Sequence, residues 1–171
     1  VHEPGVTPLG KQLSRWLKWS RGIAISPLSE LMLFNASRNQ LVTEIIQPSL
    51  KNGKIVICDR YADSTTAYQS YGRGLDSVLV ETINNASTHQ IKPNLTILLD
   101  IPIEVGFARK KKHRQDRFEQ EDIAFYYRIR EGYLKLAASE PERWLVIDAT
   151  QSKQMVAEII WQRVNHLINS S

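Results

Sequence analysis

Hydrophobic residues occur along this chain in short β-branched runs separated by longer stretches with helical spacing. Two runs, residues 54–58 (KIVIC) and 95–100 (LTILLD), have the pattern of strands buried on both faces of a parallel sheet, and residues 144–148 (WLVID) are a third predicted strand. Between them, apolar positions recur every three or four residues, which is typical of amphipathic helices. Strands that alternate with helices in this way predict a single α/β domain with a parallel sheet.

Proline and glycine positions predict where the helices begin and end. Thr7-Pro8 and Ser26-Pro27 each place an N-cap residue before a proline at the first helical position. We expect Pro48 to kink or end the long second helix, and Gly53 to stop it. The other predicted helices cover residues 77–88, a short stretch from 103, 120–138 and 152–168.

Composition narrows the class of protein. A hydrophobic content of 42% and a charged content of 23% are typical of a globular protein and exclude a disordered chain. No apolar run reaches membrane-spanning length, and no signal-peptide pattern opens the chain. The single cysteine, Cys58, cannot form an internal disulfide, so we expect a reduced, cytoplasmic setting. The net charge of +4 is compatible with nucleic acid and equally with an anionic small substrate.

An acidic and a basic residue follow the first predicted strand. Asp59 and Arg60 come directly after residues 54–58, and ligands of open α/β sheets bind beyond the C-terminal ends of the strands. A carboxylate and a guanidinium at that place suit a metal-assisted, phosphate-handling site; the alternative is a capping Asp beside an Arg in a surface ion pair. The next segment favours the site, because it carries side chains that can bind a sugar and a base. They are Thr65, Thr66, Tyr68, Gln69, Tyr71 and Arg73.

A second candidate pair lies on the long predicted helix. Phe34 and Arg38 are four residues apart, so they share one helix face. Together they could supply a ring that stacks on a base and a guanidinium that meets a base carbonyl. A core phenylalanine beside a solvated arginine is the alternative interpretation.

The most basic part of the chain lies between residues 109 and 117. It comprises Arg109, Lys110, Lys111, Lys112, His113, Arg114 and Arg117. One interpretation is a mobile lid that brings positive charge to transferring phosphates; the alternatives are a solvated face and a nucleic-acid patch. No aromatic residues interleave with these charges, which disfavours single-strand binding. The four histidines and the cysteine show no zinc-site spacing.

Taken together, these motifs resemble those of the thymidylate kinase (dTMP kinase) family of bacterial type, in the family's order and along nearly the whole chain. The matching segments are Glu3-Pro4-Gly5 with Thr7 and Gly10, Phe34 with Arg38, Asp59-Arg60-Tyr61, Thr65 with Tyr68 and Gln69, Leu99-Asp100 with Glu104-Val105-Gly106, Asp116-Arg117-Phe118-Glu119, and Asp148-Ala149-Thr150. His2 and Val6 depart from the pattern, because the family usually has Arg and Gly there.

The resemblance implies a three-layer parallel α/β fold of the P-loop nucleoside monophosphate kinase type, as one domain over residues 1–171 with a lid at about 109–119. It implies transfer of the γ-phosphoryl group of ATP to dTMP, giving dTDP, with Mg²⁺ as cofactor. It also implies a homodimer, and neither a membrane nor nucleic acid as partner.

Residue by residue, the resemblance assigns three groups of side chains. The implied dTMP-binding residues are Glu3, Phe34, Arg38, Arg60, Thr65, Tyr68 and Gln69. The implied catalytic residues are Asp59, Arg60 and Arg117, with Asp59 also serving the metal. The implied lid contacts to the ATP phosphates are Arg109, Arg114 and Arg117.

One family motif is missing from the sequence. No Gly-x-x-x-x-Gly-Lys-[Ser/Thr] segment occurs, and in the family this P-loop precedes the Glu-Pro-Gly loop by about one strand-helix-strand unit. We therefore expect an N-terminally incomplete domain that lacks its first strand, P-loop and first helix. We also expect that these 171 residues alone neither fold cooperatively nor phosphorylate dTMP.

Two other functions stay open at this point. One is a non-catalytic remnant or paralogue that binds nucleotide or a partner subunit. The other is a deoxynucleoside kinase, which is disfavoured by Glu3-Pro4-Gly5 and by the segment 65–74.

Overall fold

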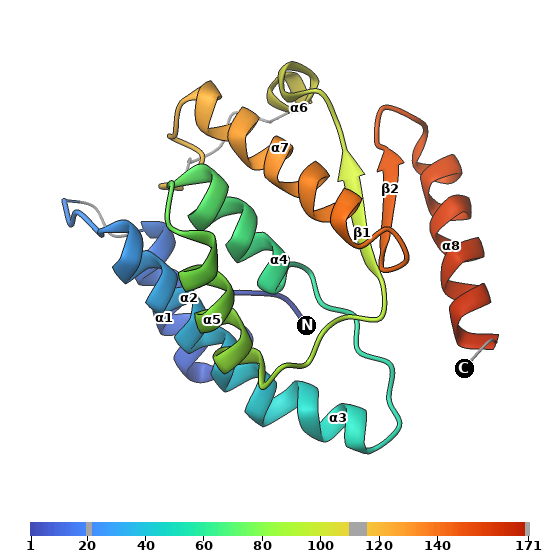
Figure 1. Ribbon diagram of the computed structural model, residues 1–171, viewed down its shortest axis with the longest axis horizontal. Helices are drawn as coiled ribbons and strands as arrows, with labels where there is room; N and C mark the ends of the chain where they lie inside the picture. Colours follow the sequence, from blue (N-terminus) through green and yellow to red (C-terminus); the bar gives the residue numbers. More distant parts are fainter. Residues whose placement is uncertain (20–21, 110–115, 170–171) are drawn as a thin grey trace. The chain divides into compact units, whose positions relative to one another are not determined.

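The computed structural model describes residues 1–19, 22–109 and 116–169 (Figure 1). The chain groups into two units, the first made of Val1–Lys92 with His113–Tyr133 and the second of Pro93–Lys112 with Leu134–Ser171. We describe each unit by itself. None of the helices in the described ranges is both long enough and apolar enough to span a membrane.

The first unit is helical. Its elements are α1 (Pro8–Trp19), α2 (Pro27–Leu41), the π-helix η1 (Val42–Ile46), α3 (Gln47–Lys51), α4 (Ala62–Thr65), the π-helix η2 (Thr66–Gly72), α5 (Ser77–Thr88) and the N-terminal part of α7 (Ile123–Ser139). The second unit contains β1 (Thr96–Asp100), α6 (Ile103–Arg109), the rest of α7, β2 (Trp144–Asp148) and α8 (Lys153–Asn169).

The predicted helix starts form as the sequence indicates. At the start of α1, Thr7 Oγ1 accepts a hydrogen bond from the Gly10 amide at 3.0 Å. At the start of α2, Ser26 Oγ accepts one from the Ser29 amide at 3.2 Å. Each bond satisfies one of the amides that a helix leaves unpaired in its first turn.

The long second helix differs from the prediction at Pro48. The helical path does not end at Pro48 but continues through the π-helix η1 into α3, in whose first turn Pro48 lies. The path then ends before Gly53, which has φ of 68° as a helix-stopping glycine should. The predicted apolar side of α2 is only partly buried, because Leu28 and Met32 are exposed.

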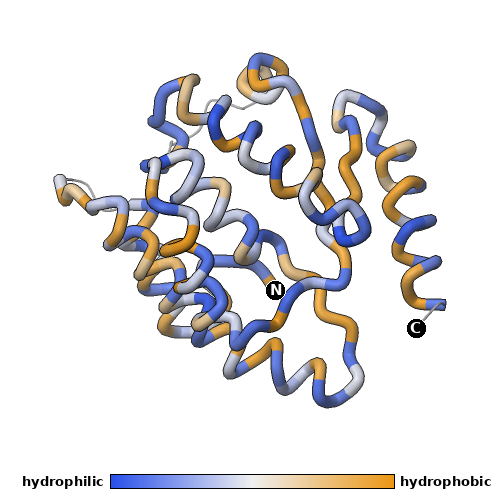
Figure 2. Tube along the Cα trace, viewed as in Figure 1, coloured by the Kyte–Doolittle hydropathy of each residue, from blue (hydrophilic) through white to orange (hydrophobic). Residues whose placement is uncertain are grey.

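Residues 54–58 do not form the predicted strand buried on both faces. The segment is hydrophobic (Figure 2) and irregular. At one edge its Ile57 carbonyl accepts a hydrogen bond from the Val1 amino group at 2.8 Å, and the next residue but one, Asp59, forms an isolated parallel bridge with His2. The side chains of Ile55 and Ile57 are 70% and 82% exposed. A doubly buried strand needs neighbours at both edges and on both faces, and the described residues supply a neighbour at one edge alone.

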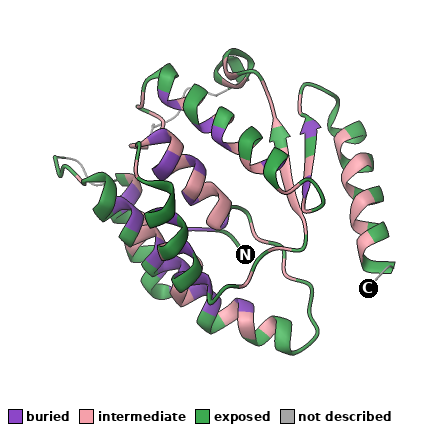
Figure 3. Ribbon diagram, viewed as in Figure 1, coloured by how far each residue is buried: buried purple, intermediate pink, exposed green. Residues whose placement is uncertain are grey.

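The second unit contains the parallel sheet. β1 pairs with β2 in parallel register, from Thr96 opposite Trp144 to Asp100 opposite Asp148, which confirms the α/β class. The predicted complete burial of the strand at 95–100 is wrong: β1 is only partly buried, with Leu99 51% exposed. α8 follows β2 and packs beside it, and no residue of α8 in the described range is buried (Figures 1 and 3).

Two hydrophobic clusters form the core of the first unit. One contains Leu41, Val42, Ile46 and Tyr61, and the other contains Ala67, Phe125 and Ile129. The first cluster joins the end of α2 to the segment that carries Asp59 and Arg60. The second joins η2 to α7, so both clusters hold segments that bear predicted site residues.

The contact between η2 and α7 is unusually close at two glycines. A Cβ atom added to Gly72 would lie 2.7 Å from Phe125 Cε2, and one added to Gly132 would lie 2.6 Å from Tyr71 Cγ. Each helix therefore places an aromatic ring against a glycine of the other, and any larger residue at either position would force the backbones apart.

Candidate functional site

A buried guanidinium lies at the centre of the predicted site. Arg38, in α2, is 1% exposed. Its Nε donates to Glu3 Oε2 at 2.8 Å, and its Nη2 donates to Thr65 Oγ1 at 2.7 Å. Its Nη1 donates to the side-chain oxygens of Asn84 and Asn35, at 3.1 and 3.2 Å. The structure thus brings Glu3, Arg38 and Thr65 together although they are distant in the sequence.

Two polar atoms beside Arg38 have no hydrogen-bond partner among the described residues. They are Oε1 of Glu3 and the hydroxyl of Tyr61, and both are buried. Burial raises the pKa of Glu3, while the ion pair with Arg38 at 2.7 Å acts in the opposite direction. Tyr61 lies against the same guanidinium, with its ring centroid 5.5 Å from Arg38 Cζ. Buried polar groups are normally paired, so these two atoms are available to a polar ligand group.

Arg60 follows the hydrophobic segment in a strained backbone conformation. Its φ of 66° lies in the left-handed region that non-glycine residues rarely adopt. The side chain is exposed, and its Cζ lies 5.3 Å from the centroid of the Tyr68 ring. The electrostatic interaction with Tyr68 raises the pKa of Arg60, so the guanidinium stays cationic. Arg60 and Tyr68 therefore contact each other.

Aromatic rings from four segments meet next to this site. The ring of Phe34 lies 5.7 Å from that of Phe118, and Tyr68 lies 5.9 Å from Phe118, measured between centroids. Tyr68 also contacts Phe125 edge-on at 6.1 Å. Phe34 and Tyr68, the two rings among the predicted dTMP-binding residues, therefore share Phe118 as a neighbour. The sequence placed Phe118 only in the closing motif of the lid.

Glu30 is the residue that sequence analysis missed. It lies in α2, its side chain is fully buried, and it accepts a hydrogen bond from Gln69 Nε2 at 2.7 Å. Its carboxylate also accepts hydrogen bonds from Arg73 at 3.2 and 3.3 Å and a very short one from Arg117. The available signal was its position, four residues before Phe34 and hence on the same helix face.

The remaining predicted cations fall in different places. Arg117 also donates from Nε to the Leu17 carbonyl at 3.0 Å, and its amide bonds the Lys18 carbonyl at 3.1 Å. Arg109 belongs to the second unit, where its Nη1 donates to the Ala149 carbonyl at 2.9 Å. Arg114 lies outside the described residues.

The side chains that could hold the implied Mg²⁺ are few. No cluster of three or more metal-ligating side chains occurs within the described ranges. Asp59 is exposed and stands next to Arg60. Mg²⁺ is commonly held through one or two carboxylates together with substrate phosphates and water, so a single exposed carboxylate next to the Arg60 guanidinium fits this mode.

Cys58 is expected to react slowly with alkylating agents. Its Sγ donates to the Arg60 carbonyl at 3.1 Å, and burial raises the pKa of the thiol to about 12. Because alkylation needs the thiolate, iodoacetamide should label Cys58 roughly 50-fold more slowly than free cysteine at pH 8. The rate should rise about tenfold per pH unit up to pH ~10. Unfolding the protein in guanidinium should restore the normal rate, whereas a plateau near pH 8.5 in the folded protein would contradict this prediction.

Comparison with known proteins places the chain in a family. The thymidylate kinase family model matches residues 1–160. A thymidylate kinase of Dehalococcoides mccartyi is 49% identical over 168 residues, which are 98% of this chain and 81% of that protein. One from Trichlorobacter lovleyi is 44% identical over 167 residues, covering 94% of this chain and 79% of that protein.

A solved structure agrees with these relatives. The crystal structure of thymidylate kinase from Ehrlichia chaffeensis superposes with a TM-score of 0.71 at 35% identity, covering 89% of this chain and 70% of that one. The fold is thus that of the α/β nucleoside monophosphate kinases. The chain belongs to the thymidylate kinase family, as its motifs predicted, and this is a family of ATP-dependent kinases that act on dTMP.

Proposed function

We propose that this protein transfers the γ-phosphoryl group of ATP to the 5′-phosphate of dTMP, giving dTDP for dTTP synthesis. The observation that carries the proposal is the buried Arg38, which holds Glu3 and Thr65 and lies on the α2 face that also presents Phe34. These residues belong to three separate segments, and each falls on a motif of the family.

The acceptor nucleotide dTMP would be bound by aromatic and polar side chains at its base and sugar and by a cation at its 5′-phosphate. The Phe34 and Tyr68 rings offer faces for the thymine and its sugar, while the buried Arg38, whose nitrogens are all bonded within the protein, would serve the base by holding Glu3 and Thr65 in place. Thr65 and Gln69 add polar contacts. Arg60, cationic and exposed at the end of the hydrophobic segment, would bind the 5′-phosphate.

Phosphoryl transfer depends on positioning and charge neutralisation more than on covalent chemistry. Asp59 would hold Mg²⁺, which supplies positive charge to the phosphates when bound. Arg117, with Arg109 or Arg114, would bring further positive charge as the lid closes. We further propose a cytoplasmic homodimer with exposed tryptophans of α1, Trp16 and Trp19, at its interface.

The donor side of the reaction needs a further element. The 171 residues contain no glycine-rich P-loop, whose backbone amides and lysine hold the ATP phosphates in enzymes of this fold. We therefore propose that phosphoryl transfer takes place when a P-loop segment accompanies these residues. The same absence favours the second candidate, a non-catalytic family member that binds nucleotide.

The two candidates are separated by one comparison. The product of the complete coding sequence should convert dTMP and ATP to dTDP, whereas the isolated 171-residue chain should give no dTDP and melt without a sharp transition. The exposed Ile55 and Ile57 indicate why, because their segment lacks half of its neighbours.

Chromatographic separation of the nucleotides and differential scanning calorimetry measure both expectations. No dTDP from the complete product would favour the non-catalytic candidate, and phosphorylation of thymidine in place of dTMP would favour a deoxynucleoside kinase. A sharp transition with dTDP production by the isolated chain would refute the dependence on a P-loop.

A further inference from the structure

The Glu30 carboxylate collects donors from two segments that are far apart in the sequence, the end of η2 and the segment 116–119. Its Oε1 accepts from Gln69 Nε2 and Arg73 Nε, at 2.7 and 3.2 Å. Its Oε2 accepts from Arg73 Nη2 at 3.3 Å and from Arg117 Nη2. Gln69 belongs to η2, Arg73 follows it, and Arg117 belongs to the segment 116–119.

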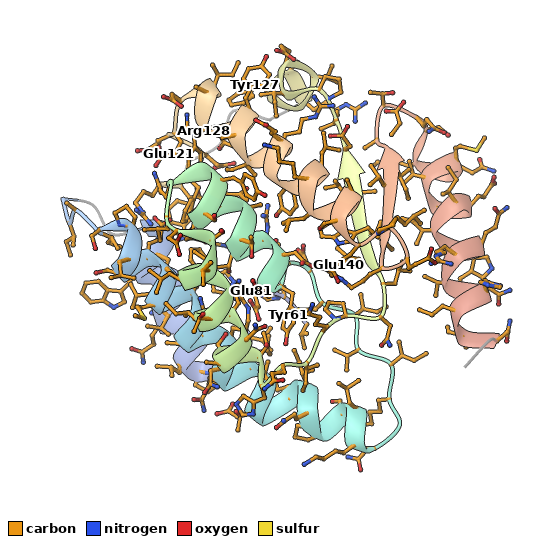
Figure 4. All side chains as sticks on the ribbon, viewed as in Figure 1. Tyr61, Glu81, Glu121, Tyr127, Arg128 and Glu140 are labelled. Atoms are coloured by element: carbon orange, nitrogen blue, oxygen red, sulfur yellow. The ribbon has the colours of Figure 1, made fainter. Side chains whose placement is uncertain are left out.

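The charges around this carboxylate are balanced. Arg73 also pairs with Glu121, labelled in Figure 4, at 2.6 Å between Nη1 and Oε1. Two carboxylates thus face two guanidinium groups, whose side chains are only 16% and 21% exposed. A buried charge is tolerated when it is paired and hydrogen-bonded, and the two guanidinium groups supply both for the Glu30 carboxylate.

The arginine-paired Glu30 carboxylate fixes the orientation of the Gln69 amide. It can only accept hydrogen bonds, so the NH₂ group of Gln69 must face Glu30 and the amide oxygen must point elsewhere. Thymine carries an N–H donor at N3, whereas cytosine carries an acceptor at the same position. A fixed amide oxygen therefore suits thymine and rejects cytosine.

The same carboxylate ties the segment 116–119 to this pocket. Arg117 is held by Glu30 and by the Leu17 carbonyl, and the next residue, Phe118, contacts both Phe34 and Tyr68. Holding Arg117 therefore also holds Phe118 against the two rings proposed to meet the base and sugar.

We propose that Glu30 is a positioning residue that sets the Gln69 amide for thymine and anchors the segment 116–119 over the dTMP pocket. This inference rests on the proposed function, because it assumes that dTMP binds beside Phe34 and Gln69.

The test compares dTMP and dCMP binding by the protein expressed from its complete coding sequence, using isothermal titration calorimetry. In Glu30→Gln the new amide can donate as well as accept, so Gln69 can turn over. We expect dTMP to bind at least tenfold more weakly and the ratio of dCMP to dTMP dissociation constants to fall at least tenfold. Glu44→Gln, an equal charge change at an exposed position of η1, should leave both values within twofold of the parent.

A second variant separates positioning from stability. Glu30→Gln combined with Arg117→Gln removes one charge of each sign, so it should regain most of the melting temperature while the nucleotide ratio stays low. If Glu30→Gln alone does not fold, the ratio of dCMP to dTMP dissociation constants is measured on this double variant.

The outcomes are distinct. A parent protein that does not bind dTMP overturns the proposed function and this inference with it. A parent that binds dTMP, with an unchanged ratio in Glu30→Gln, overturns the inference alone. Equal weakening of both nucleotides that recovers together with the melting temperature would show a purely structural role and would also overturn it.

Discussion

Replacing Arg38 by methionine is expected to destabilise the protein by about 3–5 kcal/mol and to abolish dTMP binding. The guanidinium is 1% exposed and is the partner of the equally buried Glu3 carboxylate. Methionine fills a similar volume but provides no donor. The substitution therefore leaves a desolvated carboxylate and the Thr65 and Asn84 oxygens without their partner.

Urea unfolding of the protein expressed from its complete coding sequence measures this loss. Adding Glu3→Gln to Arg38→Met removes the unpaired carboxylate, so the double variant should regain at least half of the lost stability without regaining dTMP affinity. A loss below about 1 kcal/mol in Arg38→Met would mean that water reaches the pair and that its burial contributes little.

Replacing Arg60 by glycine is expected to lower kcat/KM for dTMP about 1000-fold while the free energy of unfolding changes by less than about 1 kcal/mol. The backbone at this position has φ of 66°, which glycine adopts without strain. That gain roughly offsets the lost contact with the Tyr68 ring. The proposed phosphate contact has no such replacement, so activity and stability should separate.

Arg60→Lys is the matched control for charge. It keeps the positive charge and the backbone strain but loses the planar fork that binds two phosphate oxygens, so a roughly 30-fold loss is expected. The readout is steady-state kinetics at varied dTMP. Activity in Arg60→Gly within tenfold of the parent would remove Arg60 from the phosphate site.

Local sequence signals predicted the helices well because they depend on neighbouring residues. The cap at Ser26 and the glycine at position 53 act within one helical turn, and both appear where expected. The helix at residues 77–88 and the strand at 144–148 have the predicted bounds. Their periodicity and their flanking residues agreed, which is the condition under which such predictions succeed.

The segment 54–58 shows what local sequence signals cannot predict, namely the partners of a strand. Its β-branched run is compatible with a strand, but a strand is completed by its neighbours, and the run does not specify them. In the described residues a single edge is paired, so Ile55 and Ile57 stay exposed.

The hydrogen-bond partners of Glu30 could not be predicted from the sequence, because they are also distant along the chain. Glu30 is 39 residues from Gln69, 43 from Arg73 and 87 from Arg117. No spacing rule connects such positions, and only the folded helices bring them together. The family motifs did locate Arg38, Thr65 and Glu3 correctly as neighbours, because a shared fold carries long-range information that periodicity does not.

The two close glycine contacts have a mechanical consequence. The Phe125 ring of α7 packs against Gly72 of η2, and the Tyr71 ring of η2 packs against Gly132 of α7. The two contacts lie almost two turns apart along α7. Sliding α7 along η2 by even one residue would drive a ring into a backbone. The packing at these two glycines therefore fixes the register of the N-terminal part of α7 along η2.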